Sequence, residues 1–409
     1  MIVEFSVKNF RSIKEIQTVS LVAAPIKSKT SEIDESNTID FSEKLKLLKS
    51  IAIYGANGSG KSNLILAMIR MLVITRDIMK DDKLLYQVHE PFALNERSIF
   101  EPTYFQIQLI IDNKKYRYGF EFNEKRIVSE WLFGPADKQE TYYFTRDLKD
   151  IKVNETYFKE GKDLQDKTTP ENLFLNVAKT FNGVISKKIK DYFSGNIAIS
   201  GGVTDFGLRE TTIEMLNHPK LKKYVIDLLN FADLGIDDVI EEEIELEKGK
   251  RKEKIVLSQR PLFNEEGKKT GKNYHMTIDG GESEGTRKVF NYAGSVISSL
   301  REGRTLVLDE FDARLHPSLT KKIVEMFNSK LNTRNAQLIF ATHDTNLLDS
   351  NLLRRDQIYF AEKNSKFETG FYSLYDFKGI RNDASFERDY IKGKYGAIPY
   401  IGDFEKVFE

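Results

Sequence analysis

The sequence predicts an α/β fold: a mixed core sheet with flanking helices, an antiparallel β meander, and an insertion made of helices and a hairpin. Residues 50–54 and 63–74 are typical of a buried strand and a helix joined by a glycine-rich loop. Residues 104–158 repeat short alternating strands and turns, which indicates the meander. Residues 305–310 and 337–343 are apolar strands separated by one helical stretch, the pattern of a parallel βαβ unit.

The composition narrows the class of protein. A chain of 409 residues has room for roughly two or three domains. The chain has 62 basic and 62 acidic residues, so its net charge does not favour binding to nucleic acid. Binding through a local basic patch is the alternative. The absence of cysteine excludes disulfides, thiol catalysis and cysteine metal sites. Residues 1–5 do not resemble a signal peptide, and Arg70 interrupts the longest apolar stretch, so we expect a cytoplasmic protein without a membrane segment.

Three stretches outside the motifs carry weaker signals. Residues 1–10 largely alternate apolar and polar side chains, which predicts a strand. Residues 27–46 are polar and weakly periodic, so we expect a surface loop or a poorly ordered segment there. The many aromatic residues of 104–158 are expected to pack a half-buried sheet rather than to form a platform for stacking bases.

The insertion is expected to be helical and then to form a charged hairpin. Residues 168–171 favour a helix start, and an apolar residue follows at every fourth position: Leu173, Val177, Phe181, Ile185 and Ile189. Residues 212–232 predict a helix pair interrupted at 218–219. Acidic residues 241–247 and basic residues 250–260 then face each other, so that charges pair across strands. Contact with DNA or RNA phosphates is the alternative for the basic cluster of Lys248, Lys250, Arg251, Lys252 and Lys254.

Residues 55–62, G-A-N-G-S-G-K-S, match the phosphate-loop pattern G-x-x-x-x-G-K-[S/T] at every fixed position. Its glycines let N–H groups close around phosphate oxygens, and the following helix N-terminus adds partial positive charge. We expect Lys61 to reach the β- and γ-phosphates of a nucleotide and Ser62 to ligate Mg²⁺. The alternative, a glycine-rich turn, is disfavoured by the flanking strand and helix. The expected binding residues of the loop are Asn57, Gly58, Ser59, Gly60, Lys61 and Ser62.

Two strands in the second half end in residues suited to nucleotide hydrolysis. Residues 305–308 are followed by Asp309, which we expect to hold Mg²⁺, and by Glu310, which we expect to position and deprotonate the attacking water. Residues 337–342 are followed by His343, which a βαβ unit would place beside Glu310 and the γ-phosphate. The alternative for His343 is a satisfied residue at a strand end.

A glycine-containing turn precedes these two strands. Ser283 is a good N-cap for a helix whose buried stripe contains Val289, Ala293, Val296 and Leu300. The turn therefore forms a capped helix and, under a functional interpretation, an anion-binding helix N-terminus at Ser283 and Gly285.

Together these motifs resemble the ABC-type ATPase head, a P-loop NTPase fold, of the SMC, RecF and OLD proteins. The resemblance covers nearly the whole chain and rests on residues 7–12, 283–286, 309–317 and 341–344, in addition to the phosphate loop. Glu284 and Thr286 depart from the family's signature. The resemblance implies that ATP and Mg²⁺ bind in a homodimer or higher homo-oligomer, with Ser283 and Gly285 of one chain facing Lys61 of another. Residues 1–158 and 273–376 would form the head, 159–272 an inserted arm and 377–409 a tail.

More narrowly, the order of motifs and residues 393–399 resemble bacterial ATPases of the RloA or AbiL type, which lie in phage-defence loci. This implies an ATPase that senses or regulates, with a separate toxin or nuclease as effector. Two alternatives are a RecF-like DNA repair ATPase and a slow nucleotide-switched binding module. Gln87, Gln106 and Gln108 are candidates for the Q-loop, and Arg11 is a candidate phosphate contact. No base-reading motif separates ATP from GTP.

Overall fold

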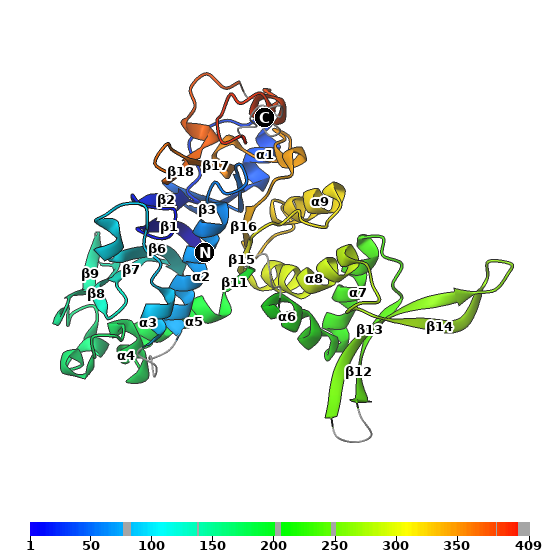
Figure 1. Ribbon diagram of the computed structural model, residues 1–409, viewed down its shortest axis with the longest axis horizontal. Helices are drawn as coiled ribbons and strands as arrows, with labels where there is room; N and C mark the ends of the chain where they lie inside the picture. The colour runs from blue at the N-terminus through cyan, green and yellow to red at the C-terminus, as the bar shows by residue number, and fades with distance from the viewer. Residues whose placement is uncertain (77–82, 137–138, 201–205, 247–250, 382, 400–409) are drawn as a thin grey trace, which may run out of the picture.

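The molecule is organised around a core sheet (Figure 1). The computed structural model describes residues 1–76, 83–136, 139–200, 206–246, 251–381 and 383–399. The strand order is β11-β15-β16-β5-β17-β18, and all neighbours are parallel except β17 and β18. The strands are β11 (Ile197–Ser200), β15 (Thr305–Leu308), β16 (Gln337–Ala341), β5 (Ser50–Tyr54), β17 (Ile358–Lys363) and β18 (Thr369–Ser373). In register, Leu308 lies beside Phe340 and Ala341 beside Ile53, so three strands end at one edge. The expected mixed sheet is confirmed.

Helices cover both faces of this sheet, and side-chain alternation along β5 shows why. Ile51 and Ile53 join an apolar cluster with α2 (Lys61–Arg76) and α5 (Val184–Gly195). Ala52 and Tyr54 join the cluster on the opposite face, which includes side chains of α8 (Glu284–Glu302) and α9 (Pro317–Phe327). A strand buried on both sides reads as a continuous apolar run, which is the pattern that the sequence has here.

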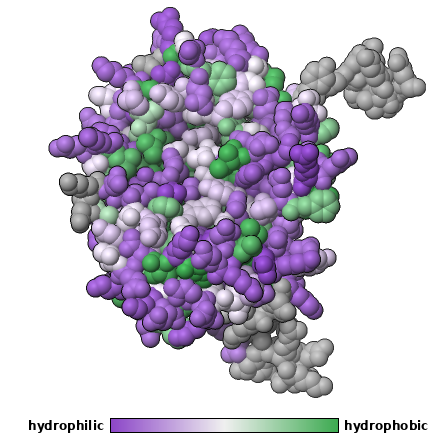
Figure 2. Space-filling view, turned by 90° about the vertical axis from the view of Figure 1, so that its left-hand side faces the viewer, coloured by the Kyte–Doolittle hydropathy of each residue, from purple (hydrophilic) through white to green (hydrophobic). Residues whose placement is uncertain are grey.

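The second large sheet contains the predicted first strand and the meander, and every neighbouring pair in it is antiparallel. Its strands, in spatial order, are β10 (Asp150–Val153), β9 (Glu140–Asp147), β8 (Ile127–Pro135), β7 (Lys114–Phe122), β6 (Thr103–Ile111), β1 (Ile2–Lys8) and β2 (Gln17–Ser20). Phe105, Phe120, Phe122 and Phe144 are fully buried, as expected for core packing. The face seen in Figure 2 is largely hydrophilic, with small separate hydrophobic patches.

The prediction of a surface loop or a poorly ordered segment at residues 27–46 is wrong. This stretch contains α1 (Ser31–Ser36) and the hairpin of β3 (Thr38–Ser42) and β4 (Leu45–Leu48). Ile39 and Leu47 are buried in a small cluster with Val3 and Ile110. The stretch therefore covers the end of the antiparallel sheet.

The first part of the expected insertion packs within the head. Helices α4 (Phe174–Thr180) and α5 contribute to the cluster around α2, and β11 extends the core sheet. The apolar stripe 173–189 is divided between these two helices. The chain turns at Asn182, whose φ is 64, and the Glu160 carboxylate accepts the N–H of Ile185 at 2.9 Å, so a second helix begins.

In the remaining part of the insertion, two helices pack on the head and a small antiparallel sheet extends away from it in Figure 1. Helices α6 (Phe206–Leu216) and α7 (Pro219–Phe231) pack against α8, with a break at the expected place. The predicted hairpin is present as β12 (Asp238–Leu246) and β13 (Arg251–Phe263), and β14 (Lys269–Thr277) adds a third strand that the sequence did not indicate. Lys254 pairs with Glu241 at 3.2 Å, whereas Lys248 and Lys250 lie outside the described residues.

Two short helices complete the head. Helix α3 (Lys83–Val88) follows α2, and α10 (Phe386–Ile391) lies in the expected tail. The ring of Tyr390 packs 5.9 Å from that of Tyr54, at the end of β5. Within the described part of the chain, every helix is too short or too polar to cross a bilayer.

Candidate phosphate-binding site

Residues 55–62 connect β5 to α2 in a loop held from outside by β18. Gly58 and Gly60 have φ values of +74 and +108, which side chains rarely adopt. A side chain at Gly60 would also collide with Thr369 of β18. The Thr369 hydroxyl donates to the carbonyl of Ser59 at 2.8 Å. Thr369 therefore supports the loop at Ser59 and Gly60.

The loop forms one wall of a cavity of about 380 Å³. The lining residues come from five parts of the chain: Arg11, Asn57, Gly58, Ser59, Gly60, Lys61, Ser62, Asn63, Asp309, Glu310, Ala341, Thr342, His343 and Lys363. All the expected residues of the loop and of the two strand ends are among them. They meet because β15, β16 and β5 are adjacent and parallel, so their carboxyl ends share one edge.

Lys61 is buried at the base of this cavity. Its ammonium group donates to the carbonyl of Gly55 at 2.8 Å and to that of Ala56 at 3.2 Å. Burial lowers the pKa of Lys61 to about 8, and the carboxylates of Asp309, Asp312 and Glu310 oppose this shift. A multiply charged anion in the cavity would favour the protonated form and relieve the cost of burying this charge.

Asp309 and Glu310 occupy different environments although they are adjacent. Asp309 is buried, and burial raises its pKa while a hydrogen bond from the Ser62 hydroxyl opposes the rise. Glu310 is exposed to the cavity and has a φ of 46. Its carbonyl accepts a hydrogen bond from Lys288 at 3.3 Å. The buried acid is thus placed beside the Ser62 hydroxyl, and the exposed acid faces the open part of the cavity.

Several donors in the loop are free to meet an anion. Within the described residues, the N–H groups of Gly58 and Gly60 donate no hydrogen bond, and those of Lys61 and Ser62 begin α2, where no intrahelical acceptor exists. The hydroxyl of Ser59 is buried and has no hydrogen-bond partner. These donors, together with Lys61, fit phosphate oxygens.

The same wall fits a hydrated magnesium ion carried by a nucleotide. No group of three or more histidine, aspartate or glutamate side chains in the described residues could hold a metal by itself. One carboxylate, Asp309, and one hydroxyl, Ser62, do lie together. Magnesium commonly takes only one or two protein ligands and completes its shell with water and phosphate, so this pair suits it.

His343 lies at the cavity wall, two residues after the end of β16. Its N–H donates to Asp312 at 3.1 Å. Partial burial, followed by the positive charge of Lys61, lowers the pKa of His343, and the carboxylates of Asp312, Glu310 and Asp309 oppose the change.

Arg11, the weaker candidate, also lines the cavity. Its guanidinium pairs with Glu90 at 2.9 Å and donates to Asn63 at 3.2 Å. Lys363 at the end of β17 lines the cavity as well, and no sequence motif predicts its place there. Its place depends on β17 pairing with β5, and strand register of this kind leaves no local pattern.

The signature-like turn lies in a different hollow of about 660 Å³, which also includes residues of α7 and α9. Ser283 is exposed, and its hydroxyl caps α8 by accepting the N–H of Thr286 at 3.1 Å. Glu284 pairs with Arg314 at 3.1 Å. Ser283 and Gly285 line this hollow and not the cavity of Lys61. The expected helix cap is therefore present, and one chain does not bring the two turns together.

None of the three glutamines proposed for a Q-loop lines the Lys61 cavity. Gln106 accepts a hydrogen bond from the Trp131 indole at 3.0 Å, and Gln108 donates to Glu4 within the antiparallel sheet. Gln87 is exposed on α3. The structure therefore gives these side chains places away from the phosphate loop.

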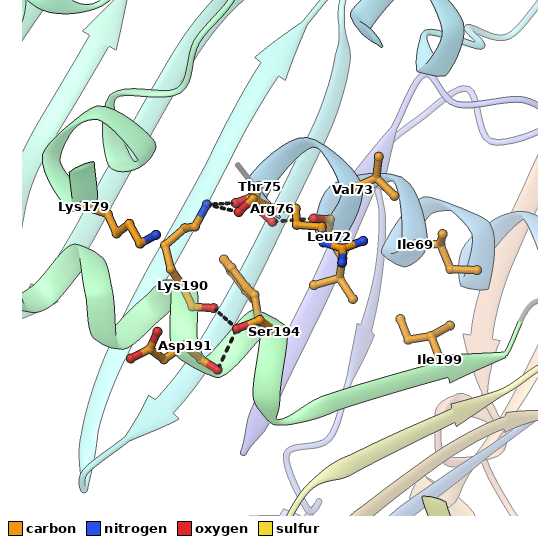
Figure 3. Close-up of a pocket in the computed structure, with 11 residues that line it drawn as sticks. Ile69, Leu72, Val73, Thr75, Arg76, Lys179, Lys190, Asp191, Ser194 and Ile199 are labelled. Carbon is orange, nitrogen blue, oxygen red and sulfur yellow. Dashed lines mark hydrogen bonds between the residues drawn. The ribbon is translucent and has the colours of Figure 1, made fainter. Parts of the chain in front are cut away.

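A further cavity of about 630 Å³ lies behind α2 and is not a second phosphate site (Figure 3). Its buried cation, Lys190, donates to the carbonyls of Thr75 and Arg76, at the end of α2, and to Asn176 at 2.7 Å. The ammonium group thus satisfies the last carbonyls of the helix that begins at the phosphate loop. Lys190 fastens α5 to the far end of α2.

Comparison with known proteins gives a family match and two similar folds. Residues 50–349, more than half of the chain, match the family model described as "AAA domain, putative AbiEii toxin, Type IV TA system". No curated protein sequence matches the chain. The SMC head domain from Thermotoga maritima has 13% identity and a TM-score of 0.40, covering 91% of this chain and 98% of that chain. The Smc head domain bound to the C-terminal domain of ScpA, from Pyrococcus furiosus, has 12% identity and a TM-score of 0.46, covering 91% and 96%.

Proposed function

Because the chain belongs to this family of AAA domains, we propose that it is an ATPase that binds ATP with Mg²⁺ and hydrolyses it to ADP and phosphate. One observation carries the proposal. Lys61, Asp309, Glu310 and His343 come from three distant parts of the sequence and line one cavity. Such convergence is what phosphoryl transfer needs, because its catalysis depends mainly on positioning and on stabilising charge.

Each side chain has a role that its surroundings support. The loop N–H groups and Lys61 hold the phosphates, and Ser62 and Asp309 hold Mg²⁺, which supplies charge neutralisation when bound. Glu310, exposed to the cavity, orients a water molecule and accepts its proton as the water oxygen attacks the γ-phosphorus. The bond from the γ-phosphorus to the bridging oxygen breaks, and ADP leaves. His343 forms a hydrogen bond with the γ-phosphate and thereby senses its loss after hydrolysis.

We further propose that two chains share each ATP. Ser283 is exposed and Gly285 is partly exposed in a hollow separate from the cavity of Lys61, so a second copy can reach them. A two-fold arrangement would place the signature-like turn of each chain on the γ-phosphate held by the other. ATP would then join the two chains, and hydrolysis would release them.

The biological setting is proposed from the family. Its description names a toxin of a type IV toxin–antitoxin system, which supports a role as sensor or regulator in bacterial anti-phage defence of the RloA or AbiL kind. A separate toxin or nuclease chain would be the effector. Co-purification from the native locus identifies that partner, and a toxin or nuclease recovered only in the presence of ATP would support this setting.

Glu310→Gln tests the central proposal. The amide keeps the shape of the side chain but cannot accept a proton, so we expect hydrolysis to slow by about 100-fold or more while ATP still binds. The variant should accumulate as an ATP-bound dimer in light scattering. Glu265→Gln, an exposed change on the extended arm, serves as the control. An unchanged hydrolysis rate would contradict the assignment of Glu310, and a mass independent of ATP would contradict the shared site.

A further inference from the structure

Hydrogen bonds to Asp312, a residue outside the cavity, join the loop after β15 to the loop after β16. Asp312 follows Glu310 by two positions and is not among the residues that line the cavity. One of its carboxylate oxygens accepts the Thr342 hydroxyl at 2.6 Å and the N–H of His343 at 3.1 Å. The N–H of Phe311 donates to the carbonyl of Ala341 at 3.0 Å. Two consecutive residues of one loop are thus bonded to three consecutive residues of the other.

These hydrogen bonds between the two loops, which we call the joint, are also connected to α9. The fully buried Thr342 hydroxyl also accepts the N–H of Asp344 at 3.0 Å. The Asp344 carboxylate in turn accepts the hydroxyl of Thr320, in α9, at 3.0 Å. A shift of the His343 backbone must therefore displace Asp312, and Asp312 is separated from Glu310 only by the fully buried Phe311.

We propose that Asp312 is a positioning residue that fixes Glu310 and His343 relative to each other and makes their two loops move together. It touches neither substrate nor metal, and acts through Thr342 and His343. The inference rests on the proposed ATPase function, because it concerns how the general base and the γ-phosphate contact are aligned. Loss of the joint would let each side chain bind its own group while the two are no longer aligned for one reaction.

Two variants separate the geometry of Asp312 from its charge. Asp312→Ala removes both accepted hydrogen bonds. Asp312→Asn keeps an oxygen acceptor of the same shape and removes only the negative charge. The charges facing His343 are Lys61 from α2 and Asp309, Glu310 and Asp312 from the loop after β15. Since Asp312 raises the pKa of His343, its removal should move the His343 limb of the kcat–pH profile to lower pH.

The experiment measures kcat, KM and ATP affinity for the full chain and both variants. We expect Asp312→Ala to lower kcat at least about tenfold and to change ATP affinity less than about threefold, because the phosphate contacts stay intact. Asp312→Asn should keep kcat within about threefold of the wild type, with the shifted pH limb. Asp349→Ala is the matched control, since Asp349 also follows β16 and bonds to Lys321 but does not contact the cavity.

Three results overturn the inference. The first is an Asp312→Ala variant with wild-type kcat. The second is equal loss of kcat and ATP affinity in Asp312→Ala, and the third is an Asp312→Asn variant that matches Asp312→Ala with an unshifted pH profile. In each of these cases, if the wild-type chain still hydrolyses ATP, the proposed ATPase function is unaffected. A wild-type chain that binds but never hydrolyses ATP would overturn the proposed function, and this inference with it.

Discussion

The phosphate loop and the signature-like turn both place small residues at the start of a long helix, yet their surroundings differ. The first opens α2 and forms the wall of a cavity that includes Lys61, Asp309, Glu310 and His343. The second opens α8 at an exposed position, in a hollow that contains none of these residues. The α8 terminus is already satisfied, since Ser283 caps it and Glu284 lies in its first turn.

This difference leads us to expect that an anion binds first at the phosphate loop. The start of α2 has no acidic residue in its first turn, so its dipole and free N–H groups are available to phosphate. At the start of α8, a phosphate must compete with the bond between Ser283 and Thr286. We therefore expect the phosphate loop to bind ATP alone, and Ser283 to bind only when a second chain carries ATP to it.

The largest expected effect on ATP hydrolysis comes from two variants, one with a substitution in the phosphate loop and the other with a substitution in the signature-like turn. Lys61→Met should abolish ATP binding, and Ser283→Asp should lower hydrolysis by about 100-fold because its charge repels the γ-phosphate of the partner. Mixing the two inactive chains would create one intact site, from Lys61 of one chain and Ser283 of the other. An equimolar mixture should regain about a quarter of wild-type activity, since half of the dimers are mixed and each has one good site.

The controls for this mixing experiment come from helix capping. Aspartate and asparagine both cap helices well, so Ser283→Asp and Ser283→Asn should fold equally, with thermal midpoints close to the wild type. Ser283→Asn lacks the charge and should retain much more activity. A mixture no more active than its parts would break the contrast between the two turns, because it would show that each chain completes its own site.

A second expected effect exploits Lys61, the buried cation of the phosphate loop. Lys61 of the free chain loses its proton near pH 8, whereas a phosphate-bound Lys61 stays charged to higher pH. ATP affinity, followed by titration calorimetry, should therefore fall above pH 8 by up to about tenfold per pH unit. Arginine stays protonated throughout, so the weaker binding of Lys61→Arg should show no such slope. An equal slope in both would assign the titration to another group.

The same shift fixes the sign of a stability effect. The folded-state pKa of Lys61, about 8, lies below the ordinary value of 10.5 that the unfolded chain keeps. Between these values the unfolded chain binds more protons, so the Lys61 contribution makes the free energy of unfolding rise with pH across this window. Saturating ATP removes the rise, because bound phosphates keep Lys61 protonated in the folded chain as well. Denaturant titrations with and without ATP measure both effects.

The sequence was sufficient where a long periodic pattern and a motif agreed. Strands β5, β15 and β16 are apolar runs, each followed within two positions by a candidate site residue or by the phosphate loop, and parallel pairing places their ends together. The start of α8 was likewise marked by a good cap at Ser283 and a clear stripe behind it. In each of these cases the local sequence contains the physical cause of the structure.

The sequence was insufficient where the cause lies far away in the chain. The helix break near Asn182 is stabilised by Glu160, more than twenty residues earlier, so the stripe looked continuous. The short strand β11 has only four residues and takes its place by pairing with β15. The contribution of Lys363 to the cavity likewise depends on strand pairing across the sheet. Tertiary contacts of this kind leave no periodic trace in the sequence.

The smallest expected effect concerns Lys363, which makes the phosphate cavity more positive than the motif alone requires. It lies at the end of β17, is exposed and lines the cavity across from the loop. Lys363→Met should weaken ATP binding by about threefold to tenfold, because an exposed cation near phosphate contributes modestly. The loss should shrink as salt is raised, since screening already weakens such a contact.

Lys366→Met is the matched control for this prediction. Lys366 lies on the turn between β17 and β18, is equally classed as exposed and does not line the cavity. Its removal changes net charge by the same amount, so any general electrostatic effect appears in both variants. Equal ATP affinity in the two variants would show that Lys363 acts only through net charge. A salt-dependent loss confined to Lys363→Met would instead extend the phosphate site of one chain to β17, and leave the signature-like turn as the part that a second chain must supply.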